Sequence, residues 1–279
     1  MTVVLGIDAA WTATEPSGVA LVASDSGGWR CIAVAPNYDA FLALPSGASV
    51  DWRRSRFCGS AVEVPHLLDA ARSLAGDTVD LVAIDMPVAT VPITGRRTAD
   101  NVISSSFGGR GCSTHTPSAD RPGSLGCSLS AAFAAAGFSI ATSSTKAGES
   151  HRLLEVYPHP ALLALLGRPY RVPYKVTKVR RYFPSSSAEQ RVASLLAEFH
   201  AIRGALEVSF GRVELPLPEP AHVKSPRLLK PYEDTLDALV CAWVAVCYAQ
   251  ESALAFGDET AAIWCPEDVM RLPALGRGV

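Results

Sequence analysis

Two acidic residues close apolar, strand-like runs of the chain. Asp8 ends the run VVLGID, and Asp85 ends the run LVAID. In an open α/β sheet, ligands bind beyond the carboxyl ends of the strands, and residues on neighbouring parallel strands lie on the order of 5 Å apart. Two unpaired carboxylates at that distance repel each other. The pair therefore predicts a bound cation, and the alternative for each residue alone is a strand-end cap or a turn.

Three further acids extend this candidate set. Asp234 and Asp237 are three positions apart in a helical pattern, so they share one helix face, although an acid at a helix start is often only a cap. Glu155 stands inside the apolar strand-like run RLLEVY. A carboxylate buried in a strand costs free energy unless it is paired or binds a metal, so Glu155 is a candidate as well.

Carboxylates without accompanying His or Cys ligands favour Mg²⁺ or Mn²⁺ over zinc. Two such ions about 3.5 to 4 Å apart are a common apparatus for phosphodiester hydrolysis, with metal-bound water as the nucleophile. The chemistry predicted from these residues is metal-dependent cleavage of a phosphodiester. The candidate catalytic residues are Asp8, Asp85, Glu155, Asp234 and Asp237.

Basic residues in two segments predict a nucleic-acid surface. Residues 168–181 (RPYRVPYKVTKVRR) carry six positive charges and no acid, interleaved with tyrosines. Cations contact phosphates and aromatic rings stack on unpaired bases, so DNA or RNA, and single strands in particular, are the expected partners. The second basic segment is the Gly/Ser-rich stretch at 94–126. The alternative for residues 168–181 is a solvated charged loop, and the alternative for the second segment is an ion pair between Arg97 and Asp100. The residues assigned to nucleic-acid binding are Arg96, Arg97, Arg110, Lys175, Lys178, Arg180 and Arg181.

The apolar patterns predict an α/β fold with a mixed sheet of five strands, namely a three-stranded antiparallel meander and two parallel strands, flanked by helices. The expected strands are residues 3–8, 18–24, 29–35, 80–87 and 151–157. The expected helices are residues 62–75, 131–140, 189–207 and 233–250. We expect one domain over 1–279, with a Gly/Ser/Arg-rich insertion at about 88–150, loop-like over 94–126, and a short C-terminal extension at about 254–279.

Composition narrows the class of protein. With 48% hydrophobic and 19% charged residues and a net charge of −2, the 279 residues predict a folded protein without a general attraction for nucleic acid or membranes. Seven cysteines without a C-x-x-C pair predict reduced core residues. The absence of a secretory signal pattern favours a cytoplasmic location. Gly and Ser interrupt the uncharged segment 122–145, which favours a buried Ala-rich helix over a membrane span.

Five motifs together resemble a widespread domain-of-unknown-function family described as predicted RNase H-like nucleases. They are GIDAAW, AIDMP, GRRTADN, EVYPHPAL and DTLDALVCAWVA, and the resemblance extends from about residue 3 to 250. It implies an RNase H-like fold, related to RuvC-type resolvases, and a metal cluster at Asp8, Asp85 and Asp237. Asp234 and Glu155 remain alternatives for a further ligand. Glu155 departs from RNase H itself, whose corresponding acid lies on a helix.

Two other functions remain open from the sequence. Actin-like and sugar-kinase folds also begin with a Gly-Ile-Asp strand and a phosphate-cradling hairpin, which makes an ATP-dependent phosphotransferase an alternative, although the chain shows no second copy of the sheet. The other alternative is a non-catalytic nucleic-acid-binding protein that keeps an RNase H-like fold.

Overall fold

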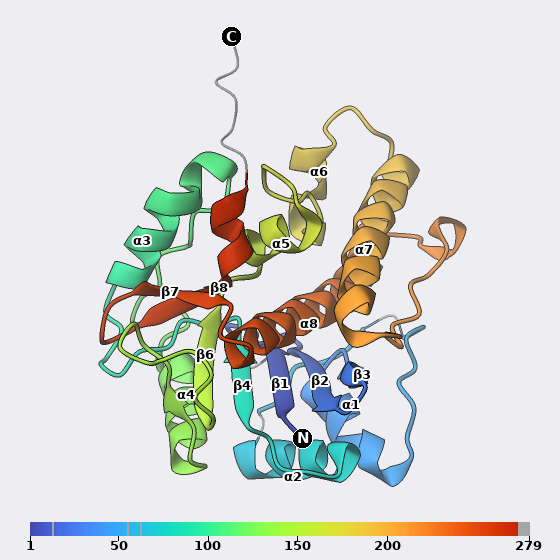
Figure 1. Cartoon of the computed structure of the whole chain (residues 1–279). Coiled ribbons are helices and arrows are strands. Elements are labelled where there is room, and N and C mark those ends of the chain that lie inside the picture. Colours follow the sequence, from blue (N-terminus) through green and yellow to red (C-terminus); the bar gives the residue numbers. More distant parts are fainter. Residues whose placement is uncertain (13, 55, 62, 273–279) are drawn as a thin grey trace.

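A mixed sheet lies at the centre of the protein, which was analysed as a computed structural model that describes residues 1–12, 14–54, 56–61 and 63–272. The strands in this part of the chain are β1 (Val3–Asp8), β2 (Gly18–Asp25), β3 (Gly28–Ala35), β4 (Leu81–Ile84), β5 (Ser139–Ile140), β6 (Arg152–Val156), β7 (Ala253–Gly257) and β8 (Ala262–Pro266). Their order is β3-β2-β1-β4-β6-β8-β7, and β5 also pairs with β6. Figure 1 shows the sheet from β7 on the left to β3 on the right.

The topology confirms a mixed α/β sheet and corrects the number of strands. β1, β2 and β3 form the predicted antiparallel meander, and β4 pairs in parallel with both β1 and β6. Eight strands among the described residues replace the five expected, because β5 joins β6 and because residues 253–266 form β7 and β8. The expected C-terminal extension thus supplies two strands, the second of which ends at Pro266, while residues 273–279 lie outside the described residues.

Eight α-helices are present in the described ranges. They are α1 (Tyr38–Ala43), α2 (Val64–Ala75), α3 (Thr98–Phe107), α4 (Ser124–Ala135), α5 (Pro158–Leu166), α6 (Val179–Tyr182), α7 (Ala188–Phe210) and α8 (Lys230–Ala249). The expected loop at 94–126 is wrong in part, because it contains α3 and the start of α4. The helix expected at 131–140 is also wrong in its bounds: α4 ends at Ala135, Gly137 takes a φ of 96°, and the chain turns into β5.

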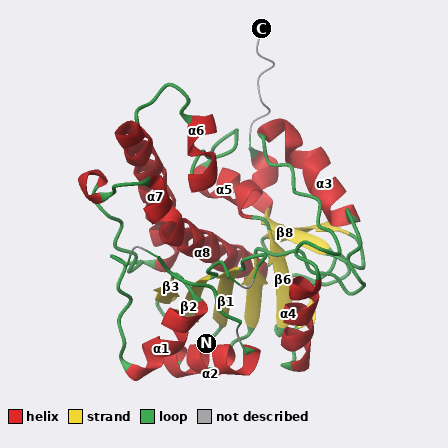
Figure 2. Cartoon of the chain, turned by 180° about the vertical axis from the view of Figure 1, so that it is seen from behind, coloured by secondary structure: helices red, strands yellow, loops and turns green. Residues whose placement is uncertain are grey.

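Helices cover both faces of the sheet. Buried side chains of α5, α7 and α8 pack on one face, and those of α1, α2 and α4 pack on the other. A third cluster joins α3 to α5, β7 and β8. Figure 2 shows the strands in yellow between these helices. Both faces of β1 and β4 are therefore buried, in agreement with their continuous apolar runs.

Two glycines let α8 approach the sheet at backbone distance. A Cβ atom on Gly6 of β1 would lie 2.1 Å from the carbonyl oxygen of Ala238, and one on Gly18 of β2 would lie 2.2 Å from that of Asp234. Only a residue without a side chain fits at such a contact. In Figure 1, α8 lies across the upper ends of β4 and β1. This contact fixes the first half of α8 over the sheet edge where β1 and β4 end.

All seven cysteines are free, but two of them correct the expectation of core positions. Cys58 and Cys127 are exposed, Cys31 is half-buried, and the other four are buried. Within the described residues, no helix has both the length and the apolar character needed to cross a membrane.

Candidate carboxylate site

Asp8 and Asp85 lie side by side at the carboxyl end of the sheet. Asp8 is the last residue of β1, Asp85 follows β4, and these two strands are parallel neighbours in which Ile7 pairs with Ile84. The amide of Asp85 donates to the carbonyl of Ile7 at 2.9 Å, which extends the ladder to the two acids. Both residues are half-buried. Neither carboxylate accepts a hydrogen bond from a described residue, so this pair is open to a ligand.

The charge of Asp8 also affects the ionisation of Asp85. Burial raises the pKa of Asp85 well above its usual range, and the negative charge of Asp8 raises it further. Lys175 opposes this rise, and Asp237 adds to it. Asp85 is thus ionised at a free-energy cost that a bound cation would remove.

Asp237, in the second turn of α8, is held by residues from a distant segment. The hydroxyl of Tyr174 donates to its Oδ1 atom, and the ammonium of Lys175 donates to its Oδ2 atom. The Asp237 side chain is fully buried. Burial raises its pKa, which Lys175 opposes and the charge of Asp8 reinforces. The third acid of the predicted cluster therefore lies near the Asp8 pair, but with a lysine already on it.

The start of α8 carries two more buried acids, which share the ammonium group of Lys230. Its Nζ atom donates to Glu233 at 2.8 Å and also to Asp234. The other carboxylate oxygen of Glu233 accepts from the amide of Val176 at 2.6 Å, and Lys175 lies 3.4 Å from Glu233. Burial raises the pKa of Asp234 well above its usual range, against the effect of Lys230.

The carboxylates of this edge outnumber its cations. Five acids face two lysines, so full ionisation leaves three uncompensated negative charges. The acids are Asp8, Asp85, Glu233, Asp234 and Asp237, and the lysines are Lys175 and Lys230. We call this group the carboxylate edge. Its net negative charge in a partly buried position favours cation binding.

The carboxylate edge fits a divalent ion in its chemistry, but it does not form a closed three-acid cage. No group of three or more His, Cys, Asp or Glu side chains in the described part of the chain is placed to hold a metal ion. The open donors are Asp8 and Asp85, whereas Lys175 and Tyr174 occupy both oxygens of Asp237. Oxygen donors of this kind suit Mg²⁺ or Mn²⁺. These residues therefore fit an ion held by the Asp8–Asp85 pair.

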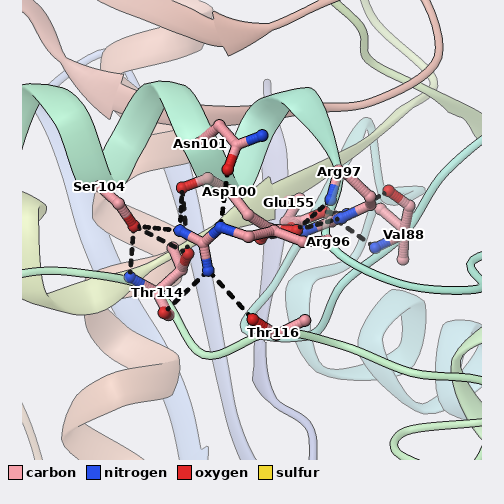
Figure 3. A network of polar contacts seen from close by, with 9 residues as sticks. All are labelled: Val88, Arg96, Arg97, Asp100, Asn101, Ser104, Thr114, Thr116 and Glu155. Carbon is pink, nitrogen blue, oxygen red and sulfur yellow. Dashed lines mark hydrogen bonds and ion pairs between the residues drawn. The ribbon is translucent and has the colours of Figure 1, made fainter.

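Glu155 is engaged by Arg97 (Figure 3). Two nitrogens of the guanidinium donate to the two Glu155 oxygens at 2.6 Å each, and Arg97 also binds Asp100 at 2.9 Å. The amide of Val88 donates to Glu155 at 2.8 Å. All three charged side chains are at most 9% exposed. This strand acid is thus compensated inside the protein, and the Arg97–Asp100 pair foreseen as an alternative is present.

Arg96 and Arg110 are also bound within the protein. Arg96 donates to the side chain of Asn101 at 2.7 Å, to the carbonyl of Asp100 at 2.9 Å and to Thr116 at 3.2 Å, so it ties α3 to the loop that follows it (Figure 3). Arg110 donates to the carbonyl of Pro169 at 2.9 Å. Both arginines connect segments of the chain.

The other basic candidates divide by their surroundings. Lys175 points inward to the carboxylate edge. Lys178 is half-buried, and Arg180 and Arg181 are exposed. The side chains of these last three form no ion pair or hydrogen bond with any residue that the structure describes. They remain available to an anion.

Some residues of the site were not foreseen as part of it. Lys230 stands three and four positions before Glu233 and Asp234, which is helical pairing distance and was visible in the sequence. Tyr174 lies 63 positions from Asp237, its hydrogen-bond partner, and no local sequence pattern predicts that contact.

Residues 6–262 match a family model described as "Protein of unknown function (DUF429)". The matched region includes every acid of the carboxylate edge. No curated protein and no solved structure matches the chain.

Proposed function

The chain belongs to the DUF429 family of proteins of unknown function, and we propose that it is a metal-dependent phosphodiesterase that acts on nucleic acid. The observation that carries the proposal is the Asp8–Asp85 pair, two adjacent carboxylates that accept no hydrogen bond from the described residues. Carboxylates that are partly withdrawn from water without a hydrogen-bond partner are costly. A functional ligand explains why two of them are retained at the edge of the sheet.

Asp8 and Asp85 would hold Mg²⁺ or Mn²⁺ in this proposal, and the ion would supply an activated water and a polarised phosphate oxygen. The chain's own contribution is positioning. The Lys175 ammonium group, held by Asp237 and Glu233, places a positive charge beside the two open acids. It is suited to balance the negative charge of a phosphate that enters the edge.

An RNase H-like arrangement is part of the same proposal. It is supported by the meander of β1, β2 and β3, by the parallel strands β4 and β6 that follow, and by an acid-bearing helix across the strand ends. Glu155 is not used as a ligand, because Arg97 binds both of its oxygens.

Metal binding tests the proposal directly. Mn²⁺ is titrated by calorimetry into the wild type, Asp8→Asn and Asp85→Asn, with Asp69→Asn as the control, since Asp69 is an exposed acid that pairs with Arg72 on α2. We expect saturable binding in the wild type and the control, and none in the other two variants. At 100 times Kd, the ion should stabilise the fold by about 2.7 kcal/mol.

Cleavage is then measured on labelled single-stranded DNA and RNA with Mn²⁺ or Mg²⁺. Cleavage that needs both Asp8 and Asp85 would support the proposal. Equal metal binding in all four proteins, or metal binding without cleavage of either nucleic acid, would overturn it and favour a binding protein.

A further inference from the structure

A group of cations next to the carboxylate edge forms no ion pair with any acid that the structure describes. Arg171, Lys178 and Arg121 lie near enough to His115 for their charges to lower the pKa of its ring, and we call these four residues the cationic cluster. We propose that the cationic cluster is a phosphate subsite that binds a second phosphate of a nucleic-acid strand, beside the one that enters the carboxylate edge. The inference rests on the proposed function and names a further part of the substrate that the protein binds.

Arg171 is the anchor of the cluster. Its guanidinium is half-buried and donates to the carbonyl of Gly111 at 3.0 Å and to the ring of His159. Its Nε atom is buried and has no hydrogen-bond partner in the part of the chain that the structure describes. Within the described residues it forms no ion pair, and its hydrogen-bond partners are neutral. A cation withdrawn from water in this way normally faces an anion, so the missing partner is a ligand of negative charge.

Lys178 adds a second cation, whose side chain forms no ion pair with a residue of the described ranges. Burial lowers its pKa, and the positive charges of Arg171, Arg181 and Lys175 lower it further, against the effect of Glu233. Burial likewise lowers the pKa of His115, and Lys178, Arg171 and Arg121 reinforce the effect. Neighbouring like charges repel each other, and a phosphate bound between them would replace that repulsion with charge-assisted hydrogen bonds.

Two contacts place the cluster against the carboxylate edge. Lys178 lies three positions after Lys175, whose ammonium group binds Asp237, and its amide donates to the Lys175 carbonyl at 3.0 Å. On another side, the guanidinium of Arg121 lies 5.9 Å from the ring centre of Trp11, three positions after Asp8. A strand of nucleic acid with one phosphate at the acids would thus present its next phosphate to these cations. Trp11 offers a ring for a base at the same place.

Binding without metal tests the subsite separately from catalysis. The full chain is studied in EDTA at constant ionic strength, by calorimetry with inorganic phosphate and by fluorescence anisotropy with a labelled single-stranded oligonucleotide that has no terminal phosphate. The variants are Lys178→Gln and Arg121→Gln, which do not remove the buried contacts of Arg171. Lys146→Gln is the control, because Lys146 precedes β6, at the opposite end of the parallel strands.

We expect phosphate to bind the wild type and the control, and to compete with the oligonucleotide. Lys178→Gln should lower the affinity for both ligands about tenfold, as expected for the loss of one charge-assisted hydrogen bond. Asp8→Asn should still bind phosphate. Failure of Mn²⁺-dependent cleavage would leave these results unchanged, so the two proposals fail separately.

Three results would overturn the subsite. The first is equal binding by Lys178→Gln and Lys146→Gln. The second is oligonucleotide binding that depends on Lys178 but does not respond to phosphate. The third is binding of phosphate without binding of the oligonucleotide, which would indicate a site for a small phosphorylated molecule.

Discussion

The buried acids of this protein fall into two groups according to their partners. Glu155 and Asp100 share the guanidinium of Arg97, which satisfies their oxygens inside the protein. Asp8 and Asp85 have no such donor among the described residues and face the carboxyl edge of the sheet. The first arrangement stabilises the fold, and the second keeps donors open for a ligand. Mutations that break the Arg97 pairs should therefore lower stability, whereas mutations of Asp8 or Asp85 should abolish metal binding.

Arg97→Met is predicted to destabilise the protein by about 3 to 5 kcal/mol, because it leaves Glu155 and Asp100 buried without a counter-charge. Adding Glu155→Gln to Arg97→Met should restore part of this loss. Urea unfolding at pH 7 measures both. Glu155→Gln alone should leave Mn²⁺ affinity unchanged, and a loss of Mn²⁺ binding in that variant would show that Glu155 is a ligand after all.

His159 is predicted to make the protein sensitive to acid. Burial and the charge of Arg171 lower the pKa of His159 well below its usual 6.5. As the pH falls below 6.5, the unfolded chain takes up a proton that the folded protein does not, so stability is full above that pH and is lost below it. The expected slope is up to about 1.4 kcal/mol per pH unit.

His159→Gln should make this slope shallower, since the Gln oxygen can still accept from Arg171 and does not titrate. Urea unfolding between pH 5 and 8 provides the comparison, with His66→Gln, at an exposed position of α2, as the control. The same slope in His159→Gln and the wild type would show that other groups cause the acid sensitivity.

At the scale of elements, α8 decides where the acids of the site lie. Nearly every residue of the helix is buried, and its first half passes over Gly6 and Gly18 at backbone contact. This depth brings Asp234 and Asp237 within electrostatic reach of Asp8. A helix held further from the sheet would leave these acids apart. The distance between α8 and the sheet thus determines whether these acids can act together.

Gly6→Ala is predicted to move α8 and to destabilise the protein by about 2 to 3 kcal/mol, because the new methyl group overlaps the Ala238 carbonyl. Mn²⁺ affinity should fall together with stability. Gly204→Ala is the matched control: Gly204 lies inside α7 with open space around it, so alanine should stabilise that helix by about 0.5 to 1 kcal/mol. Thermal unfolding of both variants checks the contrast, and a neutral Gly6→Ala would contradict the close approach.

At the scale of the whole molecule, the C-terminal strands complete the sheet. β8 pairs with β6 next to Glu155, and Phe256 of β7 packs edge-on against Phe107 of α3, with ring centres 5.3 Å apart. The third hydrophobic cluster depends on these strands. They also cover the edge of β6, and an uncovered strand edge favours aggregation.

A chain that ends at Gln250 is therefore predicted to aggregate instead of folding. Phe256→Ala tests the same packing in the full chain and should cost about 3 kcal/mol. Leu254→Ala on the same strand should cost less than Phe256→Ala, because Leu254 is 40% exposed and Phe256 only 8%. Urea unfolding compares the two, and equal losses would show that β7 does not pack as described.

Local patterns were enough for much of the fold and for the central acids. The apolar runs at β1 and β4 predicted strands that end in Asp8 and Asp85, and helical spacing predicted α2, α7 and α8. These features depend on neighbouring residues, because strand and helix periodicity arise within a few positions of the chain. The meander was predictable for the same reason, since its turns are short.

Contacts between distant segments could be read only from the folded protein. The apolar pattern does not say that Lys175 meets Asp237, that Arg97 meets Glu155, or that β8 pairs with β6. Each of these contacts spans tens of residues and is set by how the layers pack, which local periodicity does not encode. The sequence therefore determined which acids stand at the ends of strands, and tertiary packing decided which of them are neutralised and which remain open to a ligand.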